Sequence, residues 1–136
     1  MTDHTALVAQ YIACWNETDE ARRRALVAAT FADDVRYTDP LMQGTGREAL
    51  DGLIRGAQAQ FPGFRFALTR APERVDDHVR FSWQLGPAGA PGFVEGTDFA
   101  RIAPDGRLAS VHGFLDRVPS GAPDASAGDA RGGPAR

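Results

Sequence analysis

Tyr11, Asp39 and Asp98 are far apart in the sequence but have the side chains best suited to chemistry. Moving a proton next to a carbonyl group requires a base that reaches the carbon and separate neutral donors for the oxygen. One tyrosine hydroxyl and two carboxyl groups could fill these roles if the fold brings them to one pocket. The elements that carry the three residues therefore decide whether such a site exists.

Asp98 lies within the apolar run Phe93 to Ile102, which alternates like a strand. Burying an unpaired carboxylate costs several kcal/mol or forces the group to stay protonated, so such a residue is a functional candidate. If Asp98 faces inward, the small residues Gly96 and Ala100 also face inward and leave room for a ligand. If it faces outward, it lies on the solvated face near Arg101.

Asp39 and Tyr11 each have a simpler interpretation as well. Asp39 directly precedes Pro40 at the end of a predicted strand that begins at Phe31, where an aspartate commonly caps the turn. Tyr11 lies four residues before Trp15 on the apolar face of a predicted helix, a position typical of the core. Both alternatives stay open at the level of the sequence.

Helical periodicity predicts three helices in the first half of the chain. The first spans His4 to Asn16 with Thr2 or Asp3 as its N-cap, and the second runs from Asp19 to about Thr30 with Arg22 to Arg24 on its solvated side. The third begins near Gly46, where Thr45 to Glu48 has the pattern of a capping box.

After Gly63 the apolar period changes to two, which predicts half-buried antiparallel strands. A turn at Pro104 to Gly106 separates the last two strands. The predicted strands span Phe64 to Thr69, Val79 to Leu85, Phe93 to Ile102 and Leu108 to Leu115.

Composition limits the class of protein. The chain of 136 residues is 43% apolar and has a net charge of −3, which suits one globular domain and favours neither a nucleic-acid nor a membrane partner. A single cysteine, Cys14, excludes an internal disulfide and fits a cytoplasmic location. No metal or organic cofactor is indicated, because ligand clusters and Gly-rich phosphate motifs are absent. We expect a domain over residues 1–118 and a disordered Pro/Gly/Ala-rich tail over residues 119–136.

The order of these features resembles the SnoaL-like and nuclear transport factor 2-like families. The resemblance covers about Ala6 to Asp116 and is carried by the segments Phe31 to Pro40, Gly44 to Glu48, Gly96 to Ile102 and Pro104 to Leu108. It implies an α+β fold, a cone-shaped α+β barrel in which three N-terminal helices pack on a strongly curved, mostly antiparallel sheet around an apolar pocket. Fold alone does not define the reaction, because such folds host many functions.

Ketosteroid isomerases within this superfamily use a tyrosine of the first helix, an aspartate before a proline as base, and an aspartic acid on a strand. The resemblance therefore implies that Asp39 acts as general base and that Tyr11 and Asp98 donate to the oxyanion. The supporting tyrosines that some isomerases carry on later helices are absent here, so a thinner hydrogen-bond network around Tyr11 is expected. The resemblance also favours an inward Val111, Gly113 and Leu115, which leaves His112 at an interface or surface rather than as a base.

We expect the pocket to be lined by Trp15, Phe66, Phe81 and Trp83, an aromatic set suited to a flat apolar molecule. The resemblance implies a homodimer formed through the convex face of the sheet. The favoured function is proton transfer of isomerase or cyclase type on an apolar carbonyl or polyketide-like compound. The alternatives are a non-catalytic ligand-binding or dimerisation module, and an epoxide hydrolase-like or dehydratase activity.

Overall fold

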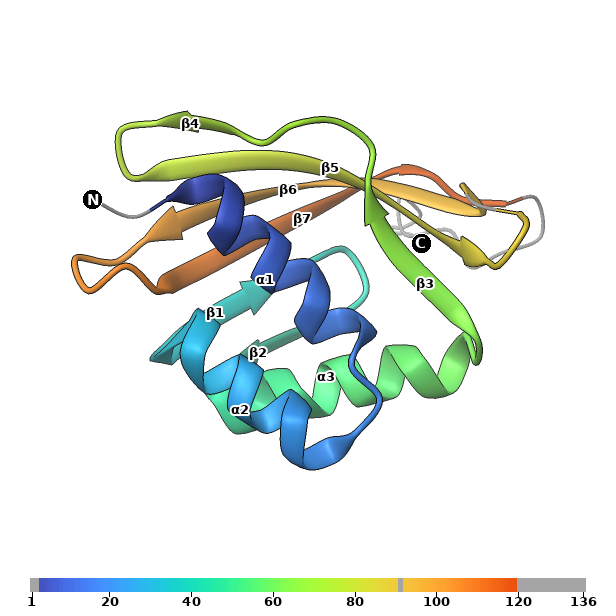
Figure 1. Cartoon of the computed structure of the whole chain (residues 1–136), viewed down its shortest axis with the longest axis horizontal. Coiled ribbons are helices and arrows are strands. Elements are labelled where there is room, and N and C mark those ends of the chain that lie inside the picture. Colours follow the sequence, from blue (N-terminus) through green and yellow to red (C-terminus); the bar gives the residue numbers. More distant parts are fainter. Residues whose placement is uncertain (1–2, 91, 120–136) are drawn as a thin grey trace.

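The computed structural model describes residues 3–90 and 92–119, in which three helices pack on one seven-stranded sheet (Figure 1). The helices are α1 (His4–Asn16), α2 (Glu20–Thr30) and α3 (Arg47–Gln60). The strands are β1 (Phe31–Thr38), β2 (Gln43–Thr45), β3 (Phe64–Leu68), β4 (Glu73–Val75), β5 (His78–Pro87), β6 (Val94–Ile102) and β7 (Leu108–Arg117). The tail expected from residue 119 onward lies outside the described residues, apart from its first position.

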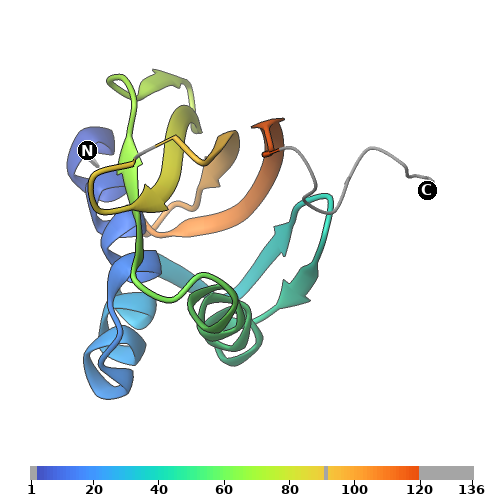
Figure 2. The same ribbon diagram turned by 90° about the vertical axis from the view of Figure 1, so that its right-hand side faces the viewer.

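The sheet has the strand order β2-β1-β7-β6-β5-β3, and β4 pairs with β5. Strands β1 and β7 run parallel, and every other pair in this sheet is antiparallel. Figure 2 shows that the long strands curve around the side on which α1 and α3 lie. This confirms the expected α+β architecture. The short strands β2 and β4 were not predicted, because three residues give too little alternation to be recognised.

Local sequence explains how the helices begin. The Asp3 carboxylate accepts hydrogen bonds from the backbone N–H groups of Thr5 and Ala6 at 3.0 and 3.3 Å, and Asp19 caps α2 in the same way. The predicted capping box of α3 is wrong. Thr45 belongs to β2, and Gly46, with a φ of 93°, stands at the N-cap without a side-chain cap. Its N–H donates to the carbonyl of Val35 instead.

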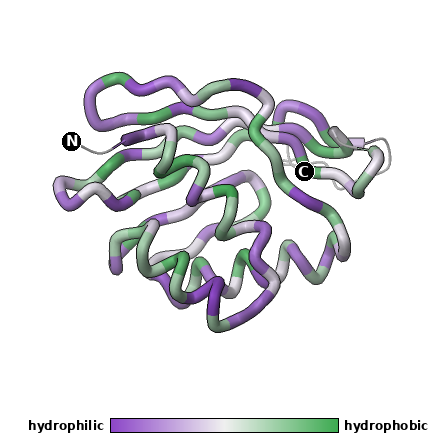
Figure 3. Tube along the Cα trace, viewed as in Figure 1, coloured by the Kyte–Doolittle hydropathy of each residue, from purple (hydrophilic) through white to green (hydrophobic). Residues whose placement is uncertain are grey.

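Alternation along the strands decides which side chains face the helices, and Figure 3 shows polar and apolar residues alternating along much of the sheet. On β6, Gly96, Asp98 and Ala100 are buried, whereas Phe99 and Arg101 face outward. On β7, Val111 and Gly113 face inward and His112 is exposed. Pleating therefore turns Asp98 to the interior.

The core is continuous between the helices and the sheet. Phe31, Phe81, Leu50 and Ile54 are almost completely buried within it. Burial of such side chains contributes about 1.5–3 kcal/mol each, so this layer fixes the helices relative to the strands.

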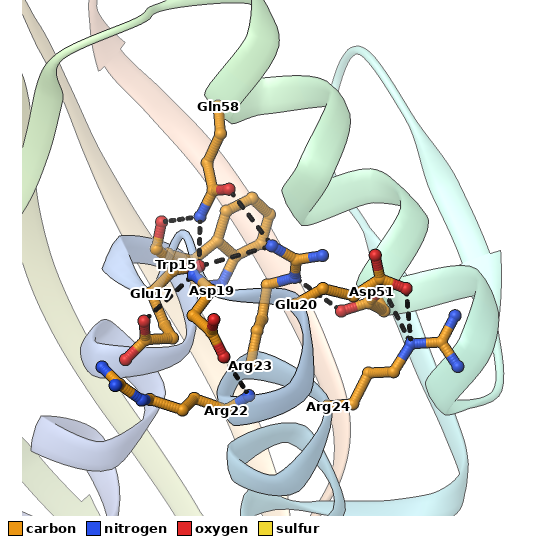
Figure 4. A network of polar contacts seen from close by, with 9 residues as sticks. All are labelled: Trp15, Glu17, Asp19, Glu20, Arg22, Arg23, Arg24, Asp51 and Gln58. Carbon is orange, nitrogen blue, oxygen red and sulfur yellow. Dashed lines mark hydrogen bonds and ion pairs between the residues drawn. The ribbon is translucent and has the colours of Figure 1, made fainter.

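A buried ion pair joins α2 to α3, which corrects the expectation that the whole arginine run lies in solvent (Figure 4). Arg23 is only 2% exposed, and its Nε donates to Asp51 at 2.7 Å. The Gln58 amide donates to the backbone carbonyls of Trp15 and Glu17 at 3.1 and 2.8 Å. Together these contacts tie the end of α1 to α3, and α1 carries Tyr11 and Trp15.

Candidate active site

A cavity of about 400 Å³ lies between the helices and the inner face of the sheet. This volume is within the usual range for small-molecule sites, and most of the wall is apolar or aromatic. None of the described residues that line it is an arginine or a histidine. The polar groups that enter it are Tyr11, Tyr37, Asp39, Gln60, Asp98 and the indoles of Trp15 and Trp83.

Asp98 is the most deeply buried of these acids, with 3% of its surface exposed. Its Oδ2 accepts a hydrogen bond from the Tyr11 hydroxyl at 2.6 Å, and its Oδ1 accepts one from the Trp83 indole N–H at 3.0 Å. Burial raises the pKa of Asp98 to about 6, against the opposing effect of these two hydrogen bonds. The group can therefore be neutral or ionised near physiological pH.

Tyr11 reaches Asp98 from α1. Its ring packs edge-on against Phe31 and Phe81, with centroids 5.7 and 4.9 Å apart, which fixes its direction. Burial, followed by the charge of Asp98, raises the pKa of Tyr11 well above its usual value. The hydroxyl is thus a neutral donor over the physiological range.

Asp39 lines the same cavity and also shapes the turn after β1, so both of its interpretations hold together. Its Oδ1 accepts the N–H groups of Leu41 and Met42 at 2.8 and 2.9 Å, and its Oδ2 accepts the Tyr37 hydroxyl at 2.7 Å. All three bonds use the carboxyl group as an acceptor, which suits its ionised form.

Tyr37 is a site residue that the sequence analysis missed. Burial, with further contributions from the charges of Asp98 and Asp39, raises the pKa of Tyr37 well above its usual value. The signal was present, because Tyr37 lies two residues before Asp39 on an alternating strand and so shares its inward face. Tyr37 donates to Asp39 and Trp83 donates to Asp98, so these two residues extend the network around the acids rather than around Tyr11.

Two glycines make room for the carboxyl groups. Gly113 lies opposite Asp98 in the β6–β7 register, and a Cβ at this position would be 2.9 Å from Asp98 Oδ1 and 3.3 Å from Asp39 Cβ. Gly96 lies opposite Trp83, and a Cβ there would be 2.3 Å from the indole ring. The two aspartates therefore meet at Gly113, and the indole of Trp83 lies against Gly96.

The structure places three of the four predicted wall residues, Trp15, Phe66 and Trp83, on the cavity. Phe81 is not among the lining residues, because its ring is buried behind Tyr11. The Trp15 N–H lies close enough to lower the pKa of Tyr11 slightly but has no hydrogen-bond partner.

His112 lies on the outer face of β7 opposite Phe99, away from the cavity, so it is not placed to act as a base there. Within residues 3–90 and 92–119, no cluster of at least three His, Cys, Asp or Glu side chains is arranged to hold a metal ion. No described helix is both long enough and apolar enough to span a membrane.

Fold and cavity together define a cone-shaped α+β protein with a polar group of acids and tyrosines inside an apolar pocket. The family model for the SnoaL-like domain matches residues 8–111. The chain therefore belongs to the SnoaL-like family. No curated protein matched the chain.

Solved structures agree with this assignment. A proposed isomerase of the SnoaL-like family from Agrobacterium tumefaciens is 41% identical, with a TM-score of 0.81 over 86% of this chain and 100% of that one. A proposed ketosteroid isomerase from Kribbella flavida is 23% identical, with a TM-score of 0.64 over 90% and 84% of the two chains. A SnoaL-like protein from Jannaschia, described as a proposed polyketide cyclase, is 17% identical, with a TM-score of 0.63 over 81% and 85%. The last two similarities concern the fold alone.

Proposed function

We propose that this protein is a proton-transfer enzyme of isomerase or cyclase type that acts on a neutral, apolar carbonyl or polyketide-like compound. The observation that carries the proposal is that two aspartates in unlike environments line one apolar cavity and both approach Gly113, Asp98 with its Oδ1 and Asp39 with its Cβ. Two titratable groups held in different environments are the usual basis for separate acid and base roles.

Asp39 is the base in this proposal. Its carboxylate is held by the turn and by Tyr37, so its orientation is fixed. No arginine or histidine among the described residues forms a salt bridge with it. A fixed carboxylate at the cavity wall can remove a hydrogen from the carbon next to a bound carbonyl.

Tyr11 donates to the oxygen on which charge develops, and Asp98 supports Tyr11 in this role. Tyr11 stays neutral and supplies a hydroxyl hydrogen, and Asp98 can become neutral because its pKa is about 6. Such donors act strongly in a site shielded from water, where they need no reorganisation during the reaction.

The wall of the cavity supports a neutral, apolar substrate class. Trp15, Phe66 and Trp83 present aromatic faces, while two carboxyl groups and no described cation disfavour an anionic ligand. A flat, neutral ring compound with one carbonyl oxygen fits these conditions best.

Hydrogen exchange at carbon tests the role of Asp39 without knowledge of the natural substrate. We expect the protein to accelerate exchange of the α-hydrogens of 2-tetralone in D2O, as followed by proton NMR. The Asp39→Asn substitution keeps an acceptor for the turn but removes the base, so the exchange rate should fall by at least about 100-fold.

Asp34→Asn is the matched control, because Asp34 is an exposed carboxylate on β1, the strand that ends directly before Asp39. It should exchange hydrogens at the wild-type rate. Equal rates for wild-type protein and Asp39→Asn would remove Asp39 from the mechanism. Binding of the ketone by wild-type protein with no exchange would favour the non-catalytic ligand-binding alternative.

A further inference from the structure

The groups around Asp98 form a single row that begins at the Trp83 indole and ends at the Tyr11 hydroxyl. We infer that Trp83 is a positioning residue: its N–H fixes which oxygen of Asp98 can carry a hydrogen, and thereby decides when Tyr11 can donate to a ligand. The inference depends on the proposed function in one respect only: that function supplies the neutral ligand oxygen to which Tyr11 donates.

The count of donors gives the first step. An indole N–H can only donate, so Asp98 Oδ1, at 3.0 Å from Trp83, must remain an acceptor in both protonation states. When Asp98 is neutral, its hydrogen therefore resides on Oδ2. This oxygen is the one that lies 2.6 Å from the Tyr11 hydroxyl.

Two states follow from this geometry. With Asp98 ionised, the Tyr11 hydrogen is used in the bond to Oδ2 and is not available to a ligand. With Asp98 neutral, Oδ2 donates to the Tyr11 oxygen, and the Tyr11 hydrogen is free to turn into the cavity. Trp83, Asp98 and Tyr11 thus act in series, and the ligand oxygen receives its hydrogen from Tyr11 alone.

The position of the Trp83 ring is built into the sheet. It lies against Gly96 on the neighbouring strand, where any side chain would collide with the ring, and it contacts the Phe66 ring edge-on at 5.4 Å between centroids. Trp15 provides the contrast, because its indole also lines the cavity but its N–H has no partner. Only Trp83 is therefore tied to the acid.

The other charged groups near Asp98 are acids, and both raise its pKa. Asp39, at the turn after β1, and Asp116, on β7, both raise the pKa of Asp98, and its two hydrogen-bond donors lower it. Tyr37, on β1, faces the same space and is neutral because its pKa is raised. No arginine or histidine of the described residues is paired with Asp98, so no cation competes for control of its titration.

The test measures two quantities on the full chain: the carboxyl titration of Asp98 by 13C NMR, and the affinity for 2-naphthol by calorimetry between pH 5 and 8. This probe carries a phenolic hydroxyl, which stays neutral below about pH 9. For wild-type protein we expect the affinity to fall about tenfold per pH unit above the titration of Asp98, since only the neutral acid releases the Tyr11 hydrogen.

Trp83→Phe keeps a ring but removes the donor to the ionised acid. We expect Asp98 to titrate at a higher pH than in wild-type protein, and the fall in affinity to begin at that higher pH. Trp15→Phe is the matched control and should leave the titration of Asp98 unchanged. Asp98→Asn copies the neutral state, since its carbonyl can accept from Trp83 and its amide can donate to Tyr11, so its affinity should not vary between pH 5 and 8.

If Asp98 titrated at the same pH in Trp83→Phe as in Trp15→Phe, the proposed role of Trp83 would be wrong. An affinity that declines with pH equally in wild-type protein and Asp98→Asn would overturn the serial arrangement, as would a failure of wild-type protein to bind 2-naphthol at pH 5. The predicted titrations and affinities together with no α-hydrogen exchange would support this inference and remove only the proposed catalysis.

Discussion

At the scale of residues, the site depends on giving similar acids different surroundings. Asp98 is enclosed by apolar and aromatic groups that disfavour its charge, whereas Asp39 accepts two backbone N–H groups and a tyrosine hydroxyl that suit its charge. The same side-chain chemistry can thus serve as a hydrogen donor in one place and a base in the other.

The cost of burying Asp98 leads to a prediction about stability. Its pKa rises from 3.8 to about 6, so the native state binds this proton more tightly than the unfolded chain. Its contribution to stability is therefore largest below pH 4 and is lost as the pH rises to 6, a change of about 3 kcal/mol. Asp98→Asn should be more stable than wild-type protein by up to this amount at pH 8.

Urea unfolding at pH 4 and pH 8 measures the difference. The advantage of Asp98→Asn should shrink towards zero at pH 4, where wild-type Asp98 is neutral as well. A stability difference of the same size and sign at both pH values would contradict the proposed burial of an ionisable acid.

Gly113 provides a second prediction at this scale. Gly113→Ala places a methyl group 2.9 Å from Asp98 Oδ1, so the acid must move. Because the φ of Gly113 is not in the left-handed region, we expect the variant to fold. Its α-hydrogen exchange rate should fall at least about tenfold, since misplacement of about 1 Å can cost far more.

Gly56→Ala is a useful comparison for Gly113→Ala. A Cβ at Gly56 meets no atom within 4 Å, so the titration of Asp98 should not change, and removal of a mid-helix glycine should stabilise α3 by about 1 kcal/mol. An unaltered exchange rate in Gly113→Ala would show that the acids do not need their present placement.

At the scale of elements, α1 must be held firmly, because Tyr11 and Trp15 enter the cavity from it. The buried pair of Arg23 with Asp51 connects α2 to α3, and the amide of Gln58 connects α3 to the end of α1 (Figure 4). Site geometry therefore depends on a contact that lies outside the cavity.

Arg23→Leu should destabilise the fold by about 3–5 kcal/mol, because it leaves Asp51 buried without its main partner. Arg24 lies 3.9 Å from the other Asp51 oxygen and still offers that carboxylate a positive charge. We therefore expect a loss of stability near the lower end of this range. Thermal unfolding measures the change. Arg22→Leu, at an exposed position of the same run, should alter stability by less than about 0.5 kcal/mol.

If Arg22→Leu and Arg23→Leu were equally stable, the ion pair would not hold the helices together. The double variant Arg23→Leu with Asp51→Leu separates pairing from packing. It should recover much of the stability, since apolar groups of similar size often replace a buried ion pair without loss.

Much of this architecture could be predicted from the sequence, because periodicity directly reports which face is buried. The boundaries of α1 follow from the apolar pattern, whereas the inward face of β6 stayed open until the structure showed Asp98 buried. Arg23 was placed in solvent because its partner, Asp51, is remote in sequence. Local sequence favours Thr45 as a cap, because the pairing of Thr45 on β2 with Arg36 on β1 depends on tertiary structure.

The candidate site was predicted less completely than the fold. Tyr11, Asp39 and Asp98 were chosen as candidates, but their convergence on one cavity needed the three-dimensional structure. Alternation indicates that Tyr37 faces inward, but its bond to Asp39 and the bond of the Trp83 N–H to Asp98 join side chains that only the folded structure brings together. Phe81 was expected in the cavity wall but lies in the core, because alternation shows that a side chain faces inward without showing whether it reaches the cavity.

At the scale of the whole molecule, the outer face of the sheet carries apolar side chains that a monomer would leave in water. Phe99 and Phe114 are 44% and 57% exposed on neighbouring strands, and Phe99 stacks on His78 at 5.2 Å. Contiguous exposed apolar groups are typical of contact surfaces, and Phe99 and Phe114 lie on adjacent strands. We propose that this face joins two copies of the chain into a homodimer.

Phe99→Glu should convert the dimer to a monomer, because it introduces a charge into the proposed contact, and sedimentation velocity would detect the change. Val75→Glu is the control, since Val75 is 77% exposed on the short strand β4. A monomeric wild-type protein, or a dimer that persists in Phe99→Glu, would contradict the proposal.

A crystal structure with 2-tetralone bound would show whether Tyr11 and Asp39 engage a ketone together. We expect its carbonyl oxygen about 3 Å from the Tyr11 hydroxyl, and an adjacent carbon about 3–3.5 Å from an Asp39 carboxylate oxygen. The rings should lie among Trp15, Phe66 and Trp83. A ketone bound with its oxygen away from Tyr11, or with no carbon within reach of Asp39, would contradict proton transfer in this cavity.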